Sequence, residues 1–246
     1  MNKQNKNYWE DGDFYNTYVN GELSDSRKNA WKQQILKHFI PGKELTVLDV
    51  GCGPGFFSCI LSEEGHNVYA VDRSAGMLEH AKANAKSLGV SPQFHHMDIN
   101  KLSFKDNFFD LVVSRNVTWT LDDPKAVYVG FHRVLKPGGT LLIYDANWHL
   151  PFYDKDLMAW VRQNEQQYYN RFQQVFKIYD DDTTIFEGLP LSDTDRPAWD
   201  TALLKDLNFS SVNTEDDIGE QVYEDWERNL YSATPLFEIY AQKGLL

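Results

Sequence analysis

A glycine-rich turn between an apolar strand and an apolar helix constrains the fold of this chain more than any other feature of its sequence. The run 46–50 predicts a buried strand, residues 51–55 hold three glycines in a G-x-G-x-G arrangement, and a helical pattern follows over about 56–64. Glycine lets the backbone turn sharply, and it lets a ligand approach without a clash from a β carbon. The arrangement therefore predicts a ligand-binding turn at the end of a buried strand.

Strand-like and helix-like segments alternate beyond this turn. Apolar runs over 67–72, 93–97, 109–114 and 140–144 predict strands, and helices are expected over 74–88 and 124–135. Short apolar strands that alternate with helices indicate a mostly parallel sheet with helices on both faces. The predicted fold class is therefore α/β with a doubly wound sheet.

The alternation stops after residue 146 and resumes near residue 199, which divides the chain into four parts. We predict an N-terminal lid and helix over 1–42, a ligand-binding core over 43–146, an inserted aromatic and acidic cap over 147–198, and a completion of the core sheet over 199–246. The lid is expected to hold a helix over about 24–40, and the cap a long helix over about 154–176. The aromatic lid residues either cover a bound ligand or pack on the sheet; they are Tyr8, Trp9, Phe14 and Tyr18.

Charge and hydropathy exclude several classes of partner. The chain has 246 residues, with 24 Lys and Arg against 36 Asp and Glu, and a net charge of −12. Nucleic-acid binding draws much of its affinity from a basic face, so neither nucleic acid nor an anionic membrane is an expected partner. No apolar run is long enough to span a bilayer, and the polar N-terminus lacks a signal-peptide pattern, so a cytoplasmic location is expected. The oligomeric state stays open.

Two acidic residues follow the next strands at the same edge of the sheet. Asp72 ends the strand after the glycine turn, where an acid in a doubly wound fold binds the two hydroxyls of a ribose. Asp98 follows the third strand, where its carboxylate can accept a hydrogen bond from an adenine amino group. From these residues alone, a dinucleotide remains a possible ligand.

Five segments, in order, resemble the motifs of class I S-adenosylmethionine-dependent methyltransferases. The run 44–55, ELTVLDVGCGPG, resembles their first motif, and the runs 71–78, 97–98 and 109–116 resemble the second, third and fourth. The run 133–139, RVLKPGG, resembles the stretch before their fifth strand. The resemblance implies a seven-stranded Rossmann-like sheet with a final antiparallel strand, S-adenosylmethionine as the cofactor, and methyl transfer to a small molecule.

The resemblance also assigns residues to the cofactor. It implies Asp49 and the loop glycines near the methionine moiety, Asp72 on the ribose, and Asp98 near the adenine. The complete predicted set is Asp49, Gly51, Cys52, Gly53, Gly55, Asp72, Arg73, Met77, Asp98, Ile99, Arg115 and Tyr18. A nicotinamide cofactor is disfavoured, because its fingerprint has a third glycine three residues after the second, where this chain has Phe56.

The acceptor is expected outside the carboxyl ends of the central strands, where open α/β sheets bind their ligands. The predicted substrate-binding residues are Asn116, Trp119, Asp145, Asn147, Trp148, Tyr153 and Tyr168, and the catalytic candidates are Asp145, Arg115 and His149. Asp145 either contacts the substrate, as a charged partner or base, or is a structural acid that binds loop amides. A base is needed only when the nucleophile carries a proton. The cap aromatics either hold a cation on their ring faces or form the cap's own core.

Several functions remain open at the level of the sequence. The leading hypothesis is methylation of a nitrogen or oxygen atom of a small metabolite, and the acidity and the aromatics favour an amine. The alternatives are carbon methylation of a quinone or lipid precursor, and a non-catalytic module that only binds the cofactor. No metal is expected: Cys52 and Cys59 have neither disulfide nor zinc spacing, and the run 180–182 is interpreted as a solvated acidic turn.

Overall fold

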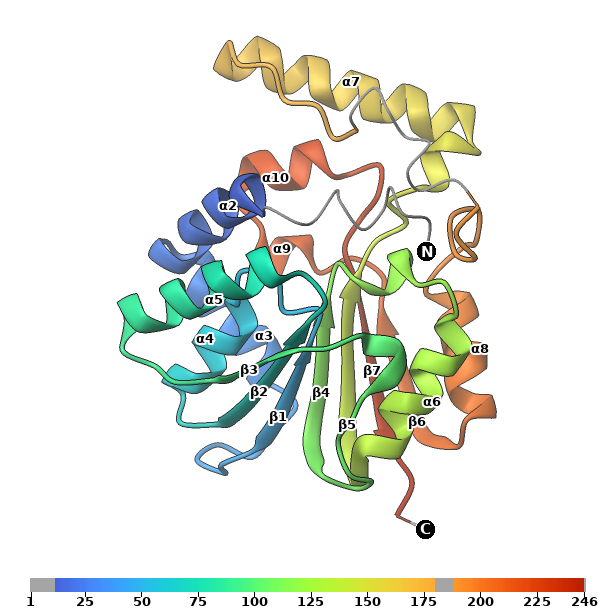
Figure 1. The fold of residues 1–246 in the computed structure, drawn as a ribbon. Helices are drawn as coiled ribbons and strands as arrows, with labels where there is room; N and C mark the ends of the chain where they lie inside the picture. The colour runs from blue at the N-terminus through green and yellow to red at the C-terminus, as the bar shows by residue number, and fades with distance from the viewer. Residues whose placement is uncertain (1–11, 180–187, 246) are drawn as a thin grey trace.

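The sheet of the computed structural model, which describes residues 12–179 and 188–245, has seven strands. They are β1 (Thr46–Val50), β2 (Asn67–Asp72), β3 (Gln93–His96), β4 (Phe109–Arg115), β5 (Leu135–Asp145), β6 (Phe209–Glu215) and β7 (Phe237–Lys243). Their spatial order is β3-β2-β1-β4-β5-β7-β6; β1 to β5 run parallel, and β7 runs antiparallel to both β5 and β6. The predicted α/β sheet with a final antiparallel strand is confirmed (Figure 1).

Helices cover both faces of this sheet. They are α2 (Asp13–Ser24), α3 (Arg27–Leu36), α4 (Phe56–Glu63), α5 (Ala75–Leu88), α6 (Pro124–Val134), α7 (Lys155–Phe172), α8 (Ala198–Asp206), α9 (Gly219–Val222) and α10 (Asp225–Leu230), with short 3-10 turns η1 (Ile99–Lys101), η2 (Thr118–Thr120) and η3 (Leu150–Phe152). On one face, Trp31 of α3 and Phe57 of α4 pack edge-on against Tyr144 of β5. On the other face, α6 and α8 bury Phe131 and Leu204 against the sheet. The doubly wound arrangement that the alternating pattern predicts is therefore present.

Capping residues set the ends of α5 where the sequence predicts them. The Ser74 hydroxyl accepts a hydrogen bond from the Met77 backbone N–H at 3.1 Å, which begins the helix. Gly89 ends it in the left-handed region, with φ of +69°, where residues other than glycine are strained. These signals are local, which is why the prediction of this helix holds.

The N-terminal region differs from its prediction. The sequence predicts a helix over about 24–40, which corresponds to the shorter α3; α2, which precedes α3 and is separated from it at Asp25, was not predicted. Asp25 is extended, and its carboxylate accepts hydrogen bonds from the Arg27 backbone N–H and Nε at 2.9 and 3.1 Å. A side chain that satisfies the neighbouring backbone in this way competes with the helix and interrupts it.

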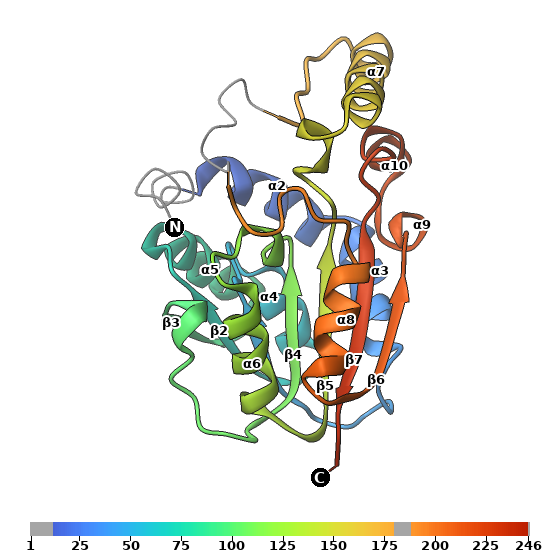
Figure 2. The ribbon, with the colours of Figure 1, turned by 90° about the vertical axis from the view of Figure 1, so that its right-hand side faces the viewer.

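The described part of the segment between β5 and α8 lies over the carboxyl edge of the sheet. α7 crosses above this edge next to α10 (Figures 1 and 2), where the Asn164 side-chain amide donates to the Leu230 carbonyl oxygen at 3.2 Å. The helix ends before the predicted residue 176, because Gln173 adopts a left-handed conformation with φ of +55°. Within the two described stretches, no helix combines the length and apolar character needed to cross a membrane.

Candidate active site

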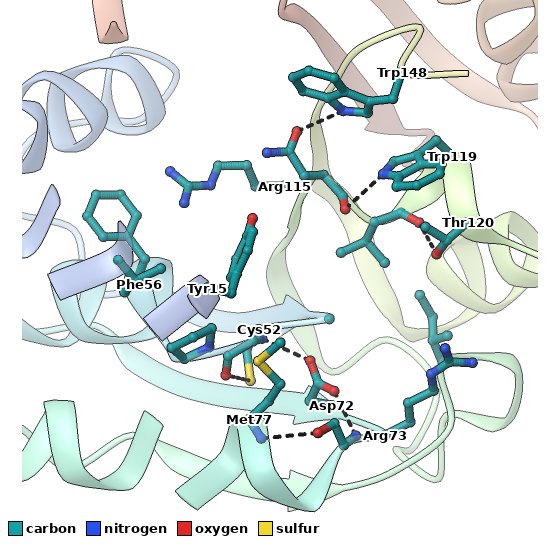
Figure 3. Close-up of a pocket in the computed structure, with 18 of the residues that line it drawn as sticks. Tyr15, Cys52, Phe56, Asp72, Arg73, Met77, Arg115, Trp119, Thr120 and Trp148 are labelled. Carbon is teal, nitrogen blue, oxygen red and sulfur yellow. Dashed lines mark hydrogen bonds between the residues drawn. The ribbon is translucent and has the colours of Figure 1, made fainter. Parts of the chain in front are cut away.

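A cavity of about 960 Å³ opens at the carboxyl edge of the parallel strands. Its walls come from the β1–α4 turn, from the ends of β2, β3 and β4, and from α2 (Figure 3). The segment 176–179 and the turns after α9 and α10 complete the wall. β1 lies between β2 and β4 in the sheet, so the strand order reverses direction at β1. Open α/β sheets bind their ligands at such a switch point.

Most of the residues that the sequence singles out line this cavity. They are Phe14, Tyr18, Asp49, Gly51, Cys52, Gly53, Asp72, Arg73, Met77, Asp98, Ile99, Arg115, Asn116, Trp119, Trp148 and His149. The predicted residues that do not line it are Gly55, Asp145, Asn147, Tyr153 and Tyr168. Tyr8, Trp9 and the acidic run 180–182 lie outside the described residues.

The glycines of the turn have two different roles. Gly51 and Gly53 border the cavity with φ of +65° and +51°, and a β carbon on Gly51 would lie 2.5 Å from the Val117 side chain. Gly55 also has positive φ, but a β carbon there would lie 3.0 Å from that of Ala81 in α5. The predicted cofactor contact of Gly55 is corrected accordingly: this glycine permits close packing of the turn on α5.

Asp72 closes the same turn. Its two carboxylate oxygens accept hydrogen bonds from the Gly53 and Ser74 backbone N–H groups, at 2.9 and 2.8 Å. Burial raises the pKa of this carboxyl. Each carboxylate oxygen can accept a further hydrogen bond, and the side chain borders the cavity. The position therefore suits a ligand with two neighbouring hydroxyls, as a ribose has.

Asp49 lies under the turn, with 2% of its surface exposed. It accepts a hydrogen bond from the Ser58 hydroxyl at 2.5 Å. Burial raises the pKa of Asp49 to about 7, although the Ser58 hydrogen bonds and the Arg115 charge act in the opposite direction. A cation bound beside this carboxylate would compensate for its desolvation. The turn therefore fits a ligand that carries positive charge, such as the ammonium and sulfonium groups of S-adenosylmethionine.

Asp98 begins η1 at another part of the wall. Its carboxylate accepts hydrogen bonds from the Asn100 backbone N–H and side-chain amide at 2.9 and 2.7 Å. Burial raises the pKa of Asp98, but these hydrogen bonds outweigh burial and hold the pKa below its usual value. Asp98 is therefore ionised at neutral pH and acts as a hydrogen-bond acceptor, as an adenine amino group requires.

Arg115, a predicted catalytic residue, is committed to a buried ion pair. Its two terminal nitrogens donate to the two carboxylate oxygens of Glu22 in α2, at 2.8 and 2.7 Å. Its guanidinium carbon also lies 4.6 Å from the centre of the Phe56 ring. The pair holds α2 against the end of β4, which fixes one wall of the cavity.

Two tryptophans converge on Asn116 at the end of β4. The Trp119 indole N–H donates to the Asn116 carbonyl oxygen at 3.2 Å, and the Trp148 indole N–H donates to its side-chain oxygen at 3.3 Å (Figure 3). His149 stacks on Trp119 with ring centres 5.1 Å apart. Burial lowers the pKa of His149 to about 4, so its ring is neutral at neutral pH. Asn116, Trp119, Trp148 and His149 thus form one part of the cavity wall, and the contacts among them fix their positions.

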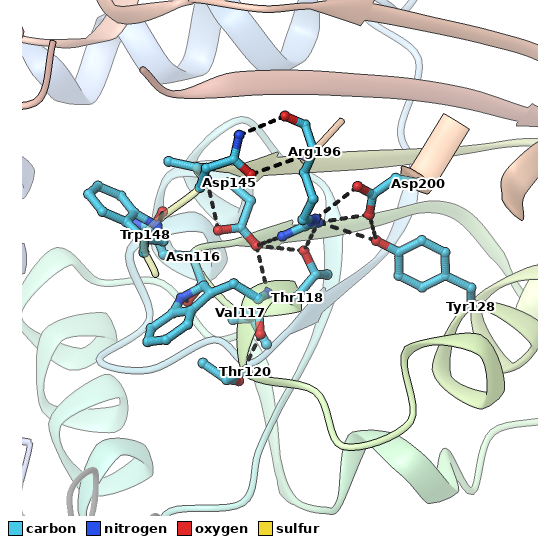
Figure 4. Close-up of polar contacts among 12 residues, drawn as sticks. Asn116, Val117, Thr118, Thr120, Tyr128, Asp145, Trp148, Arg196 and Asp200 are labelled. Carbon is cyan, nitrogen blue, oxygen red and sulfur yellow. Dashed lines mark hydrogen bonds and ion pairs between the residues drawn. The ribbon is translucent and has the colours of Figure 1, made fainter. Parts of the chain in front are cut away.

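Asp145 does not face the cavity, and the prediction that it contacts the acceptor is wrong. It is fully buried, and one carboxylate oxygen accepts hydrogen bonds from the Thr118 hydroxyl and from Arg196, at 2.5 and 3.1 Å (Figure 4). The same oxygen accepts a hydrogen bond from the Trp119 backbone N–H at 3.0 Å. Asp145 is thus the structural acid of the two alternatives, and it orders the loop that carries Trp119.

Arg196, which lies just before α8, joins this cluster. It donates to both oxygens of Asp200 at 2.8 Å each, and Asp200 also accepts from the Tyr128 hydroxyl. The Asn147 side chain exchanges two hydrogen bonds with the Arg196 backbone, at 2.8 and 3.1 Å. Asn147 is therefore occupied by the chain itself, and its predicted substrate contact is corrected.

Two predicted cap residues also lie away from the cavity. The Tyr153 side chain is 54% exposed and outside the wall. Tyr168 packs on Trp226, with ring centres 5.7 Å apart, so it belongs to the contact between α7 and the helix beside it. For Tyr168, the alternative that the cap aromatics form a core of their own is the one that the geometry supports.

Several aromatic residues of the wall were not predicted from the sequence. They are Tyr15, Phe56, Phe57, Phe176, Tyr179, Tyr223 and Tyr231. Tyr15 and Tyr18 stand at the three-residue spacing of a helix face, which is a signal that could have been found. Tyr223 and Tyr231 follow helices of four and six residues, which leave no readable periodicity.

Comparison with known proteins identifies one domain of this chain. Residues 48–143, which contain the glycine turn and β4, match the family model described as a methyltransferase domain. The chain thus contains a methyltransferase domain, and its fold is that of class I S-adenosylmethionine-dependent methyltransferases. The cofactor of this domain is accordingly S-adenosylmethionine.

Known relatives of this chain are named for different methyl acceptors. It is 40% identical over 111 residues to a malonyl-[acyl-carrier protein] O-methyltransferase of Erwinia pyrifoliae, and 37% identical over 106 residues to phosphoethanolamine N-methyltransferase 3 of Arabidopsis thaliana. These matches cover 45% and 43% of the chain, but only 40% and 21% of the relatives. A phosphoethanolamine N-methyltransferase 2 of Haemonchus contortus shares the fold, with a TM-score of 0.59 and 19% identity, over 87% of this chain and 53% of that one.

Proposed function

We propose that this protein transfers a methyl group from S-adenosylmethionine to a nitrogen or oxygen atom of a small-molecule acceptor inside the cavity. The observation that carries the proposal is the meeting of the glycine turn, Asp49 and Asp72 at the wall of one cavity of about 960 Å³. That volume lies near the upper end of the range for ligand pockets, so it has room for a cofactor and an acceptor together.

The cofactor is proposed to lie along the carboxyl ends of β1, β2 and β3. Asp72 would accept hydrogen bonds from the ribose hydroxyls, and Asp98 from the adenine amino group. Asp49 and the turn 51–53 would hold the charged methionine end. Cys52, Arg73, Met77 and Ile99 border the same stretch of the wall and would contact the cofactor through packing and hydrogen bonds.

The protein's own contribution to methyl transfer is proposed to be positioning. When bound, S-adenosylmethionine supplies a methyl group on a positively charged sulfur. In-line displacement requires the acceptor atom at about 3–3.5 Å from that methyl carbon. The wall of Asn116, Trp119 and Trp148, which internal hydrogen bonds hold rigid, would orient the acceptor.

A strong general base is not part of the proposal. Arg115 is permanently charged and bound to Glu22, and Asp145 faces away from the cavity. His149 is neutral because burial lowers its pKa to about 4, so it can accept a hydrogen bond but has little driving force to take a proton. We therefore assign His149 to acceptor orientation.

The four-part division of the chain belongs to the same proposal. α2 and the segment 176–179 border the cavity, and they would exclude water from the reacting atoms. The core 43–146 would bind the cofactor, and the lid 1–42 and the cap 147–198 would supply most acceptor contacts. The segment 199–246 completes the sheet with β6 and β7.

The proposal is tested by ligand binding followed by a search for product. Calorimetry should detect binding of S-adenosylmethionine and of S-adenosylhomocysteine, and none of NAD. Mass spectrometry of a metabolite mixture incubated with the protein and S-adenosylmethionine carrying a labelled methyl group should then reveal a labelled N- or O-methyl product. Cofactor binding without any labelled product would identify a non-catalytic module, and a carbon-methylated product would replace the proposed acceptor class.

A further inference from the structure

We infer that the acceptor is an amine that binds in an aromatic compartment next to the glycine turn, an inference that rests on the proposed function. The tyrosine compartment consists of Tyr15, Tyr18, Trp148, Tyr223 and Tyr231, all of which line the cavity. They come from α2, from the segment after β5, and from the turns that follow α9 and α10.

The rings of the tyrosine compartment hold one another in place. Trp148 meets Tyr231 edge-to-face with ring centres 5.6 Å apart, and Tyr231 lies 5.5 Å from Tyr223. Tyr15 and Tyr18 lie 6.4 Å apart on the facing helix. The Trp148 indole is also fixed by its hydrogen bond to Asn116. Several rigid rings therefore surround one region of the cavity.

The compartment adjoins the place where the methionine end of the cofactor is proposed to bind. The Tyr15 ring lies 3.8 Å from the position that a β carbon on Gly53 would take. Figure 3 shows Tyr15 between Cys52 of the turn and Arg115. A group held among these rings is therefore next to the glycine turn.

The arginines beside the compartment are already neutralised. Arg115 gives both terminal nitrogens to Glu22. Arg27 lies over the Tyr18 ring and donates to Asp25 and to Glu227, at 2.7 Å in each case. Neither guanidinium is available to bind a phosphate or carboxylate on an acceptor. An anionic acceptor therefore finds neither of these two guanidiniums free.

Beside the compartment the carboxylates of Glu22, Asp25 and Glu227 pair with the two guanidiniums of Arg27 and Arg115, which leaves one negative charge in excess. Glu227 is fully buried and accepts a hydrogen bond from the Tyr18 hydroxyl at 2.5 Å. Burial raises the pKa of Tyr231, and the Glu227 charge is the next cause. The pKa of Tyr18 is raised by burial and then by Glu22 and Glu227. The hydroxyls therefore remain protonated, and the rings and carboxylates together favour a cation.

A nitrogen acceptor gains from these rings and carboxylates as it reacts. The lone pair of a neutral amine forms the new N–C bond while the C–S bond breaks, and the C–S electron pair goes to sulfur. Positive charge thus moves from sulfur to nitrogen, toward the ring faces, and stabilisation of charge that develops during the reaction accelerates it. A tertiary amine gives a quaternary ammonium; a primary or secondary amine gives an ammonium that releases its proton to water.

The test measures preference for positive charge at equal shape. Calorimetry compares choline with its uncharged isostere 3,3-dimethylbutan-1-ol, each added to the protein saturated with S-adenosylhomocysteine. We expect choline to bind at least tenfold more tightly. Equal affinity, a preference for the isostere, or no binding of choline overturns the inference. Failure of S-adenosylhomocysteine itself to bind is a different result, because that result overturns the proposed function.

Two variants and a control locate the binding to the compartment. Tyr231→Leu removes the ring and should weaken choline binding about tenfold, while Tyr231→Phe keeps the ring and should retain most of the affinity. Both variants should still bind S-adenosylhomocysteine with native affinity, which also shows that they fold. Tyr153→Leu removes an exposed tyrosine outside the cavity and should change neither affinity. An unchanged choline affinity in Tyr231→Leu would show that the compartment is not the site.

Discussion

Replacement of Asp49 by asparagine should make the cofactor-free protein more stable above pH 7, although most changes at buried positions destabilise. Burial raises the pKa of Asp49 from 3.8 to about 7, and each pKa unit corresponds to about 1.4 kcal/mol. Ionised Asp49 thus lowers the free energy of unfolding by about 4 kcal/mol. A buried asparagine amide that lacks one partner costs about 1–3 kcal/mol, which leaves a net gain of about 1–3 kcal/mol.

The gain should depend on pH in a defined direction. In the unfolded chain Asp49 ionises near pH 3.8, whereas in the folded chain it ionises near 7. Between these values the folded state keeps the proton that the unfolded state has lost, so a rise in pH removes stability from the native protein. The advantage of Asp49→Asn should therefore grow from about pH 4 to about pH 7 and then stay constant.

Urea denaturation at about pH 5, 6.5 and 8 measures both effects, and Asp110→Asn is the matched control. Hydrogen bonds from Lys136 and Thr46 hold the pKa of Asp110 below its usual value despite burial, so its substitution should destabilise. In calorimetry, Asp49→Asn should bind S-adenosylmethionine with an affinity lower by about 1.5–3 kcal/mol, since a charge-assisted contact is lost. A variant no more stable than the native protein at pH 8, or a pH-independent difference, would refute the reasoning.

Three further substitutions probe the turn and the ion pair. Asp72→Ala should weaken S-adenosylhomocysteine binding by about 1–3 kcal/mol in calorimetry, because ribose hydroxyls are left unpaired; an unchanged dissociation constant in the folded variant would remove Asp72 from the site. Gly51→Ala should lower the free energy of unfolding, measured in urea, by about 1–3 kcal/mol, because the added β carbon would clash with Val117. Val117→Ala in the same chain should restore part of the loss, and absence of any such rescue would argue against the clash. Arg115→Met should lower the free energy of unfolding by about 3–5 kcal/mol, because it leaves the buried Glu22 carboxylate without its partner. The double variant with Glu22→Leu should recover much of this loss, and equal losses in the single and double variants would show that the pair is not coupled.

The sequence predicted those parts of the molecule whose signals are local. The strand 46–50, the glycine turn and the helix after it are adjacent in the chain, and each imposes its own backbone geometry. The ends of α5 were predictable for the same reason, because Ser74 and Gly89 act on their own helix. The alternation of strands and helices along the chain then predicted the parallel sheet. The connection between two parallel strands is almost always right-handed, which leaves few possible topologies.

The sequence failed where a side chain chooses between distant partners. The position of Asp145 at the end of β5 indicates the edge of the sheet but not the direction of the carboxylate. That direction is set by Arg196, which is 51 residues later in a segment without periodicity. Tyr223 and Tyr231 reach the cavity from very short helices, so neither helix could be predicted from its pattern. The family resemblance covers 44–146 and therefore contains no information on either contact.

The hydrogen bonds between Asn147 and the Arg196 backbone join the two ends of the cap segment at one point on the core. Because the two ends of the segment are held together, the entropic cost of closing it changes only slowly with its length. We therefore expect the length between these anchors to be changeable while the cofactor site is retained. For protein engineering, 148–195 should then act as a replaceable insert: a different segment grafted between the same two anchors should offer new acceptor contacts beside the same cofactor site.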